Sequence, residues 1–534
     1  MLARQKHKFR DIFRTSTGGS SRFAEGHELA AMRSRSDTAI PLCTAFLRDM
    51  WLRPFPEQRL ITADGHQHII TLGPSRSGKG LDIIVPALLT YRGGALLTDP
   101  KGEAVIVTAA ARARMGQRVY VLDPFGVTTD VLGGAEMPFL SSYNPLDQIE
   151  PNSPLACDDI ASLVEIMIAD KGDSPFYIPA ARRLLAALIG RSILYEPAKS
   201  IGHCLEIIAM EGQKRDHYLR GMLKTITGKR NALCMMVVDN VTEFLGASSE
   251  IKQNTITFIN NALAPLKSSP MRKVLKSSDL DFADLKRSQA TVYLVLPPDM
   301  LSSHSIWLKM IYHSAFVRIL RTQIKWTRQV LFMMDEFFSL GYIKQIETGI
   351  SIMAGLGIKL MIFIQDVNQL KKLYESCWPT FLANSSHIVI LGIGDADTGD
   401  EMVRQLGQAK RINMDAGFVV DDEDVSEATV PLLTGTELAL FTDIDGGRMI
   451  VIVNGKRPIR GWRRHYNKTF IAWEDYYPHP QYRKGPAPKA LGSPPASQPR
   501  PAGGENVVPI NHQSRSMNDG RQGNRRRSIT RKRA

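Results

Sequence analysis

The chain has 534 residues, 43% of them apolar, and a formal net charge of +14, so it is long enough for two or three globular domains with substantial cores. No run of 18 or more apolar residues occurs, which excludes a transmembrane helix within this sequence. The five cysteines contain no Cys-x-x-Cys pair, which argues against a disulfide framework or a zinc site and fits a reducing cytoplasm.

Residues 1–60 are predicted to form a basic N-terminal arm and linker. The start, "MLARQKHKFRDIFRT", holds basic residues, but no apolar region follows it, so it is not a secretory signal. This arm could touch acidic lipid or nucleic acid, which would allow peripheral membrane contact. Alternatively, it could be a solvated end of the chain.

Residues 61–151 alternate short apolar runs with helix-period segments, which is typical of parallel βαβ units. The run "HQHIITLG" (66–73) leads into a glycine-rich loop, and the helix-compatible stretch "LDIIVPALLTY" (81–91) follows it. The runs "GALLTDPKGE" (94–103) and "RVYVLDP" (118–124) are mostly apolar on both faces, as strands between two layers of helices must be. We therefore assign residues 61–151 to the first part of an α/β domain.

Between residues 152 and 288 the periodicity changes. Segments such as "DDIASLVEIMIAD" and "IPAARRLLAALIGRSILY" space their apolar residues three and four apart, which is the period of a helix with one buried face. No alternating run interrupts this region. We therefore predict an all-α domain over residues 152–288, inserted into the α/β domain.

The α/β pattern resumes over residues 289–478, which are assigned to the second part of the same domain. The segment "GRMIVIVNGKRPIRG" (447–461) has an Asn-Gly turn between two strand-like runs, which is a strong hairpin signal. The whole pattern predicts an α/β fold with a mostly parallel sheet. Further strand-like runs are "TVYLVLPP" (291–298), "QVLFMMDE" (329–336), "KLMIFIQD" (359–366) and "HIVILGIG" (387–394).

The last segment, residues 479–534, is dominated by Pro, Gly, Ser and Arg and is predicted to be a disordered basic tail. Residues 481–534 alone have a net charge of +10, so the rest of the chain carries only +4. The protein is therefore a nearly neutral globule with a basic appendage. Such a tail could bind phosphate backbones or anionic lipid, or it could be an inert solubilising segment.

The loop "GPSRSGKG" (73–80) nearly matches the phosphate-binding pattern G-x-x-x-x-G-K-[ST], whose last residue donates a hydroxyl to Mg²⁺. Gly80 stands where that hydroxyl should be. A strand precedes the loop and helix-compatible sequence follows it, so its amides would point at an anion, and Lys79 would reach the β- and γ-phosphates of a nucleotide. The predicted phosphate-binding residues are Gly73, Pro74, Ser75, Arg76, Ser77, Gly78, Lys79 and Gly80.

A nucleotide site also needs an acidic residue at the end of a buried strand. The segment "VLFMMDEFFSLG" supplies five apolar residues followed by Asp335 and Glu336. We predict that Asp335 is the carboxylate on the metal side, and that Glu336 is the general base or positions the attacking water. The alternative is a helix cap after a core strand, for which Asp is also favoured.

Three further polar residues follow predicted strands. Gln365 ends the strand "KLMIFIQ", and because the carboxyl ends of parallel strands line the ligand crevice, its amide would face the γ-phosphate or the water. It could instead be a polar cap on a strand. Asp99 and Lys101, in "TDPKGE", could join this site or a subunit interface, or they could form a salt bridge in the core.

These motifs together resemble the coupling proteins of type IV secretion and conjugation, the TraG-like DNA-transfer ATPases of the RecA/FtsK-related class. The matching segments occur in the family's order and roughly at its spacing, and they span residues 19–465. They are "GPSRSGKG", "LLTDPKGE", "VYVLDPFG", "SYNPLD", "FMMDEFFSLG", "FIQDVNQLKKLYE" and "PLLTGTELALF".

The resemblance implies a RecA-like P-loop domain that binds ATP and Mg²⁺, in a homo-hexameric ring at the cytoplasmic face of the inner membrane. Such a ring uses ATP to drive single-stranded DNA with bound relaxase, or protein effectors, into a type IV secretion channel. The inserted all-α domain corresponds to the family's substrate-receiving domain. A Gly after the P-loop lysine is common in this family, which favours a real nucleotide site in which Asp335, the phosphates and water hold the metal.

Two departures from the family pattern are visible. Family members usually carry membrane helices ahead of a segment like "TGGSSRFAEGHEL" (17–29), whereas only a short basic segment precedes it here, so we expect an anchorless variant or a reading frame that starts late. The stretch "ETGISIMAGLGIKL" (347–360) lacks the arginine expected there as a phosphate sensor or as a finger acting in trans. Arg448 is one candidate to replace it.

Two other functions are compatible with the sequence. One is a non-catalytic adaptor that binds DNA or effectors and has an idle nucleotide site. The other is a duplex-DNA translocase of the chromosome-segregation type. No folded domain is predicted beyond residue 479, which counts against the translocase.

Overall fold

A computed structural model describes residues 21–32, 34, 36–47, 57–169, 177–226, 231–413 and 426–466. All of these residues belong to one compact unit. None of the helices in these ranges is both long enough and apolar enough to cross a membrane. The predicted basic tail over residues 479–534 and the first twenty residues lie outside the described residues.

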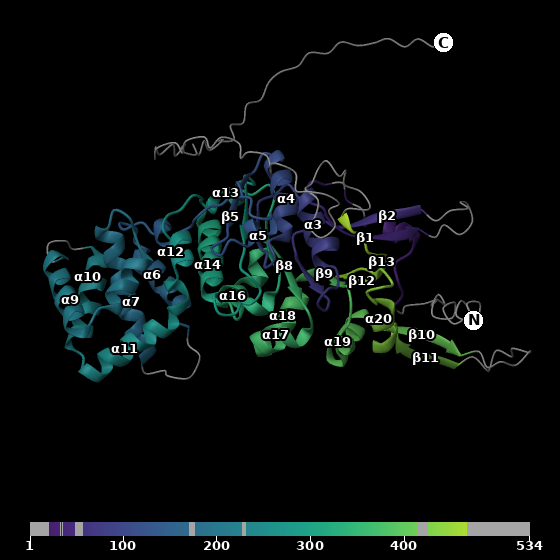
Figure 1. The fold of residues 1–534 in the computed structure, drawn as a ribbon. Helices are drawn as coiled ribbons and strands as arrows, with labels where there is room; N and C mark the ends of the chain where they lie inside the picture. The colour runs from purple at the N-terminus through teal and green to yellow at the C-terminus, as the bar shows by residue number, and fades with distance from the viewer. Residues whose placement is uncertain are drawn as a thin grey trace, which may run out of the picture. The chain divides into compact units, whose positions relative to one another are not determined.

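Eleven strands of the described chain form one sheet, in the order β2-β1-β13-β12-β9-β3-β8-β7-β4-β6-β5 (Figure 1). The seven strands from β9 to β5 pair in parallel, and β12, β13, β1 and β2 extend the sheet by antiparallel pairing. The strands are β1 (Ile40–Leu47), β2 (Glu57–Ala63), β3 (His68–Leu72), β4 (Ala95–Thr98), β5 (Arg118–Leu122), β6 (Ala290–Leu294), β7 (Val330–Met334), β8 (Ile358–Ile364), β9 (Ser385–Ile390), β12 (Arg448–Val453) and β13 (Ile459–Trp462). A separate antiparallel pair joins β10 (Gln408–Asn413) to β11 (Ser426–Pro431).

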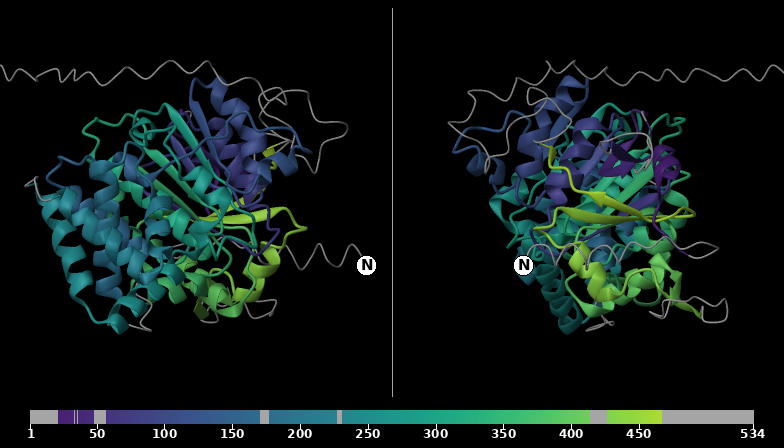
Figure 2. Two further views of the ribbon diagram at one scale, coloured as in Figure 1. Left: turned by 60° about the vertical axis from the view of Figure 1, so that its left-hand side comes forward. Right: turned by 90° about the vertical axis from the view of Figure 1, so that its right-hand side faces the viewer.

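Helices cover both faces of this sheet (Figure 2). The central strands β3, β7 and β8 are buried along their whole length, and alternate side chains enter two different apolar cores. In β3, for example, Ile70 packs into one core and Ile69 into the other. This arrangement confirms the predicted α/β fold with a mostly parallel sheet. One face is covered by α3 (Val85–Thr90) and α4 (Glu103–Arg114), and the other by α14 (Ser305–Arg321), α15 (Phe337–Leu340), α16 (Lys344–Met353), α17 (Val367–Tyr374), α18 (Trp378–Ala383) and α19 (Ala396–Leu406).

Between β5 and β6 the described chain forms helices joined by irregular segments, the longest of them between α5 and α6, with one isolated bridge from Leu140 to Val121; this largely helical segment is shown in teal in Figure 1. The region that reads as one helical stretch around residues 240–263 is two helices, because the Ser248 hydroxyl accepts a hydrogen bond from the Ile251 amide and begins a new helix there. The helices are α5 (Val127–Val131), α6 (Ala156–Met167), α7 (Tyr177–Tyr195), α8 (Ile201–Ala209), α9 (Gly212–Ile226), α10 (Ala232–Gly246), α11 (Ser249–Ala262), α12 (Ser269–Val274) and α13 (Ala283–Lys286), with short 3₁₀ turns at η3 (Pro145–Gln148) and η4 (Ala264–Lys267).

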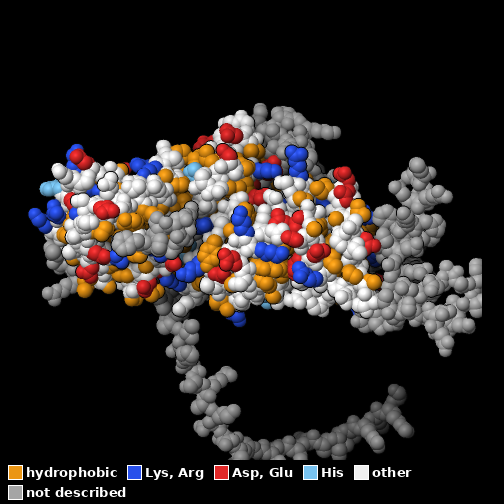
Figure 3. All heavy atoms as spheres, turned by 90° about the horizontal axis from the view of Figure 1, so that it is seen from below, with side chains coloured by type: hydrophobic (Ala, Val, Ile, Leu, Met, Phe, Trp, Pro, Cys, Tyr) orange, Lys and Arg blue, Asp and Glu red, His pale blue; other side chains and the backbone are white. Residues whose placement is uncertain are grey.

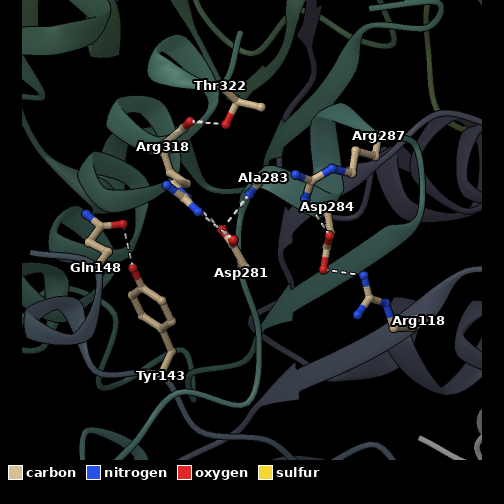
Figure 4. Close-up of polar contacts among 9 residues, drawn as sticks. All are labelled: Arg118, Tyr143, Gln148, Asp281, Ala283, Asp284, Arg287, Arg318 and Thr322. Atoms are coloured by element: carbon tan, nitrogen blue, oxygen red, sulfur yellow. Dashed lines mark hydrogen bonds and ion pairs between the residues drawn. The ribbon is translucent and has the colours of Figure 1, made fainter. Parts of the chain in front are cut away.

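Ion pairs fix the helical segment where it returns to the sheet (Figure 4). Arg318 of α14 donates two hydrogen bonds to the Asp281 carboxylate, at 2.7 and 2.8 Å, and Asp281 also accepts from the Ala283 amide. Next to it, Asp284 pairs with Arg118 at the start of β5 and with Arg287. Bidentate Arg–carboxylate pairs are among the stronger charged contacts, so this junction holds the helical segment against β5 and α14.

The described part of residues 1–60 does not form the expected arm and linker. Residues 40–47 form strand β1, which pairs with β2 and with β13 and so belongs to the main sheet. Ile40, Leu42 and Ala45 are buried there, as is Ile61 on the neighbouring strand. The prediction overlooked this strand because its other neighbour in the sheet, β13, lies about four hundred residues away in the sequence.

The expected hairpin at residues 447–461 is present. Strands β12 and β13 pair in antiparallel register, from Arg448 opposite Trp462 to Val451 opposite Ile459. The connection is longer than a two-residue turn, and Gly455 within it has a φ of +69°. On the face seen in Figure 3, basic and acidic side chains are interspersed, which fits the low net charge outside the tail.

A buried histidine on α14 makes the stability of the fold depend on pH. His313 is 5% exposed, and its Nδ1 lies 2.9 Å from the Gln345 Nε2 of α16. Burial lowers the pKa of His313 to about 4; the Asp159 and Glu165 carboxylates raise it slightly, and Arg321 lowers it. The unfolded chain therefore takes up a proton below about pH 6.5 that the folded chain does not bind above about pH 4.

Acidification should therefore destabilise the protein, and His313→Gln should reduce that loss. Between pH 7 and pH 5 we expect the substitution to remove about 2 kcal/mol of the fall in unfolding free energy. Urea unfolding of the wild type and the variant at the two pH values measures this difference. An equal fall in both proteins would show that His313 is not responsible.

Candidate nucleotide-binding site

The loop after β3 has the geometry of a phosphate-binding loop. The Gly73 amide donates to the Ile364 carbonyl of β8 at 3.1 Å, and the loop then turns with positive φ at Arg76 (+65°) and Gly78 (+85°). A Cβ atom on Gly73 would lie 2.4 Å from the Ser77 Oγ, so only glycine fits at that position. The chain continues into one π-helical turn, η2 (Gly80–Ile84), and then into α3.

Backbone donors and one cation line the inside of this loop. Within the described part of the chain, the amides of Gly78 and Lys79 donate to no other group. The Lys79 Nζ donates to the Gly73 carbonyl at 2.9 Å, so the lysine lies across the loop. Free amides together with a lysine are the groups that hold nucleotide phosphates in such loops.

Packing does not require a glycine at position 80, where the usual motif has a hydroxyl residue. A Cβ atom on Gly80 would meet no atom within 4 Å. The Ser77 hydroxyl, by contrast, is 1% exposed and makes no hydrogen bond to any group in the described ranges. The Asp335 carboxylate supplies the kind of oxygen ligand that Mg²⁺ prefers, so the residues present are compatible with a metal-bound nucleotide.

Asp335 and Glu336 follow directly after β7. Burial and the neighbouring Glu336 carboxylate raise the pKa of Asp335 to about 6, and the positive charges of Lys79 and Lys101 oppose this shift. The charge of Lys79 thus acts on the Asp335 carboxylate, as expected for two groups at the same edge of the sheet. Glu336 has left-handed backbone angles, φ 54° and ψ 48°, which cost a non-glycine residue about 1–2 kcal/mol. This unfavourable turn directs the chain away from β7 immediately after Asp335.

Gln365 follows β8, the strand that lies between β3 and β7. Its side-chain Nε2 is 3.4 Å from the Glu336 Oε2, and its backbone N–H donates to the Gln369 Oε1 at 3.0 Å. The phosphate loop, the acidic pair and Gln365 therefore leave the carboxyl ends of three adjacent parallel strands, where ligands bind in open α/β sheets.

The predicted extra residues Asp99 and Lys101 also lie at this edge. Asp99 follows β4, the neighbour of β7 on its other side, and its Oδ2 accepts from the Val105 amide at 2.8 Å. Burial, with a smaller contribution from Asp335, raises the pKa of Asp99 to about 7. Lys101 is exposed and lowers the pKa of Asp335. The two residues do not pair in a core salt bridge: Asp99 caps α4, and Lys101 faces solvent.

One nearby arginine escaped sequence reasoning. Arg463, directly after β13, donates from Nη1 to the Ser77 carbonyl at 2.9 Å. No motif marks it, because it lies far from the loop in sequence and on a different part of the sheet. The candidate Arg448 instead places its guanidinium 5.0 Å from the centre of the Phe441 ring. Its role as an arginine acting in trans stays a prediction.

The mostly parallel sheet, the glycine-rich loop after β3 and the acidic residues after β7, the next strand but one, define a P-loop protein of the α/β class. Comparison with known families then narrows this class. The family described as "Type IV secretory system Conjugative DNA transfer" matches residues 27–490, and the chain belongs to it.

Individual relatives are similar to parts of the chain. VirD4 of Agrobacterium fabrum is 25% identical over 412 residues, covering 75% of this chain and 58% of the relative. The conjugal transfer protein TraG of Escherichia coli is 26% identical over 328 residues, covering 58% of this chain and 49% of the relative. The chain thus spans about half to three-fifths of the length of these relatives.

Solved structures share the fold. The conjugative coupling protein TrwBdeltaN70 in its trigonal form with sulphate aligns with a TM-score of 0.63 at 14% identity, covering 86% of this chain and 96% of that one. TrwB in complex with ADP and Mg²⁺ aligns with a TM-score of 0.62 at 13% identity, covering 86% and 97%. At this identity the likeness establishes the fold and not the chemistry.

Proposed function

We propose that this chain is an ATP-driven coupling protein, which delivers single-stranded DNA with bound relaxase, or protein effectors, to a type IV secretion channel during conjugation. The observation that carries the proposal is the meeting of the phosphate loop, Asp335–Glu336 and Gln365 at one edge of the sheet, in a member of the DNA-transfer family. An adaptor with an idle nucleotide site would not require a glutamate and a glutamine in contact beside the loop.

In the proposed site, the free backbone amides of the loop, including those of Gly78 and Lys79, and the Lys79 ammonium hold the phosphates of ATP. Asp335 is the candidate protein ligand of Mg²⁺, which would supply charge neutralisation on the phosphate oxygens. That a structural neighbour, TrwB, was solved with ADP and Mg²⁺ supports this assignment. Asp335 binds a cation only as a carboxylate, which Lys79 and Lys101 favour.

Glu336 is the proposed acceptor of the proton from the attacking water. Its carboxylate must point at that water, and Gln365 supports this orientation through its contact with the Glu336 Oε2. Phosphoryl transfer needs positioning and charge stabilisation more than covalent chemistry, so two polar groups fixed at the ends of adjacent strands are suited to the task.

The wider assembly is also a proposal. We place the chain in a homo-hexamer at the cytoplasmic face of the inner membrane, with relaxase or effector cargo and channel components as partners. Residues 61–151 and 289–478 would form the motor, and residues 152–288 would receive cargo. These assignments rest on the family membership and on the helical character of the segment between β5 and β6.

Steady-state ATP hydrolysis without DNA, with single-stranded DNA and with duplex DNA tests the function. We expect turnover that rises with protein concentration and is stimulated several-fold by single-stranded DNA, since backbone contacts supply sequence-independent affinity. The stimulation should decline steeply as salt is raised. Stimulation by duplex DNA alone would favour a chromosome-segregation translocase, and DNA binding without any turnover would favour the adaptor.

A further inference from the structure

Arg463 makes an unusual set of contacts for a residue outside the nucleotide motifs. Its guanidinium donates to the Ser77 carbonyl at 2.9 Å and to the Thr442 carbonyl at 3.1 Å, and it also donates to the Leu391 carbonyl. Its Nε donates to the Arg448 carbonyl at 3.0 Å. One side chain thus joins the phosphate loop to the end of β9, to α20 (Gly435–Phe441) and to β12.

The contact with Ser77 acts on the amide that follows it. A trans peptide unit is planar, so the carbonyl of Ser77 and the N–H of Gly78 point in opposite directions. Holding the carbonyl from behind the loop therefore aims the Gly78 N–H into the loop, where it has no other acceptor within the described chain. A charged donor on the carbonyl also polarises the peptide and strengthens the N–H as a donor.

The space behind Gly78 is closely packed, so the peptide has little freedom to rotate without losing these contacts. A Cβ atom on Gly78 would lie 2.7 Å from the Asp82 Oδ2 and 4.0 Å from the Arg463 Nη1. His465, two residues after Arg463, places its Nδ1 2.8 Å from the Asp82 Oδ1. The segment after β13 thus contacts both the loop and the first turn of the helix that follows it.

Arg463 also remains a cation in this position. Burial lowers the pKa of Arg463, but the carboxylates of Asp82 and Asp443 oppose the shift. An arginine is protonated at neutral pH even after a substantial decrease in its pKa. Four carbonyl oxygens can therefore share one positive charge that faces away from the phosphates.

We propose that Arg463 is a positioning residue of the nucleotide site, which orients the Ser77–Gly78 peptide so that the Gly78 amide binds a phosphate. The inference rests on the proposed function, because it assumes that nucleotide phosphates occupy the loop. Arg463 touches no reacting atom, and its effect passes through the backbone of the loop. The nucleotide site is then completed by a residue that lies 386 positions after Ser77 in the sequence.

The test is the affinity of the full-length protein for Mg·ADP, measured by isothermal titration calorimetry. We expect Arg463→Ala to weaken binding about tenfold, the effect of losing one charge-assisted hydrogen bond to the loop. Arg463→Lys should recover the affinity only in part, since an ammonium cannot reach several carbonyls in a plane as a guanidinium does. Guanidinium ion added at low millimolar concentration should restore much of the affinity that Arg463→Ala loses. It should not change the affinity of the wild type.

The matched control is Arg460→Ala, on β13 itself, whose guanidinium stacks over the Phe23 ring at 4.7 Å. It removes the same charge three residues earlier in the chain and should leave Mg·ADP binding unchanged. Equal affinity of wild type and Arg463→Ala, or an equal loss in the Arg460 control, would overturn the inference. A wild-type protein that binds no Mg·ADP would instead refute the proposed function, and the inference with it.

Discussion

Lys79→Ala should lower steady-state ATP hydrolysis by at least about 100-fold, the usual cost of removing one group that stabilises charge in a transition state. The lysine lies across the phosphate loop, with its Nζ on the Gly73 carbonyl, and its charge lowers the pKa of Asp335. A nucleotide entering the loop would offer it phosphate oxygens in place of that carbonyl. Without the Lys79 ammonium, the loop has no lysine left to stabilise the negative charge that develops on the phosphates.

The measurement is turnover across a range of protein concentrations with saturating single-stranded DNA. Lys456→Ala, in the exposed connection between β12 and β13, is the matched control and should retain wild-type turnover. Hydrolysis that persists at the wild-type rate in Lys79→Ala would show that the loop is not the catalytic site. DNA binding should survive the substitution, because it relies on other parts of the chain.

Glu336→Gln should reduce hydrolysis by about 100-fold or more while the protein still binds Mg·ADP. Glutamine has nearly the same shape and can keep a contact with Gln365, but it cannot accept a proton from the attacking water. The Asp335 carboxylate and the loop amides are untouched, so binding should change little. This separation of binding from turnover distinguishes a general base from a residue that merely holds the fold.

Single-turnover hydrolysis and Mg·ADP affinity, measured on the same preparation, check this expectation. Glu347→Gln, on α16, carries the same change at a half-buried position away from the loop, where the carboxylate accepts from the Tyr342 hydroxyl at 2.5 Å. It should leave both quantities at wild-type values. If Glu336→Gln loses affinity and turnover in parallel, the glutamate has a structural role at the turn after β7.

The sequence predicted the parts of this molecule that depend on local pattern. The central strands β3, β7 and β8 are recognisable because each is a mostly apolar run buried on both faces, and each is followed by the residues predicted for the site. The contact between Gln365 and Glu336 follows from the adjacency of β8 and β7, which parallel order makes accessible to sequence reasoning.

The features that sequence reasoning missed depend on contacts between segments that are far apart in the chain. Strand β1 reads as part of a linker, and its place in the sheet is set by partners at β2 and β13. Arg463 lacks any motif, and its role is visible only when its four carbonyl acceptors are seen together. Gly80 was correctly noted as a departure, but only the structure shows that a side chain there would meet no neighbour.

The point at which the helical segment leaves the sheet has an evolutionary consequence. Strands β5 and β6 are paired neighbours at one edge, and three strands, β4, β7 and β8, separate them from β3. Lineages could therefore exchange or remodel everything between these two strands without altering the order of the strands that carry the phosphate loop and its acidic partners. The same α/β domain could in this way acquire segments that bind different partners, provided that the Asp281–Arg318 and Asp284–Arg118 ion pairs are retained.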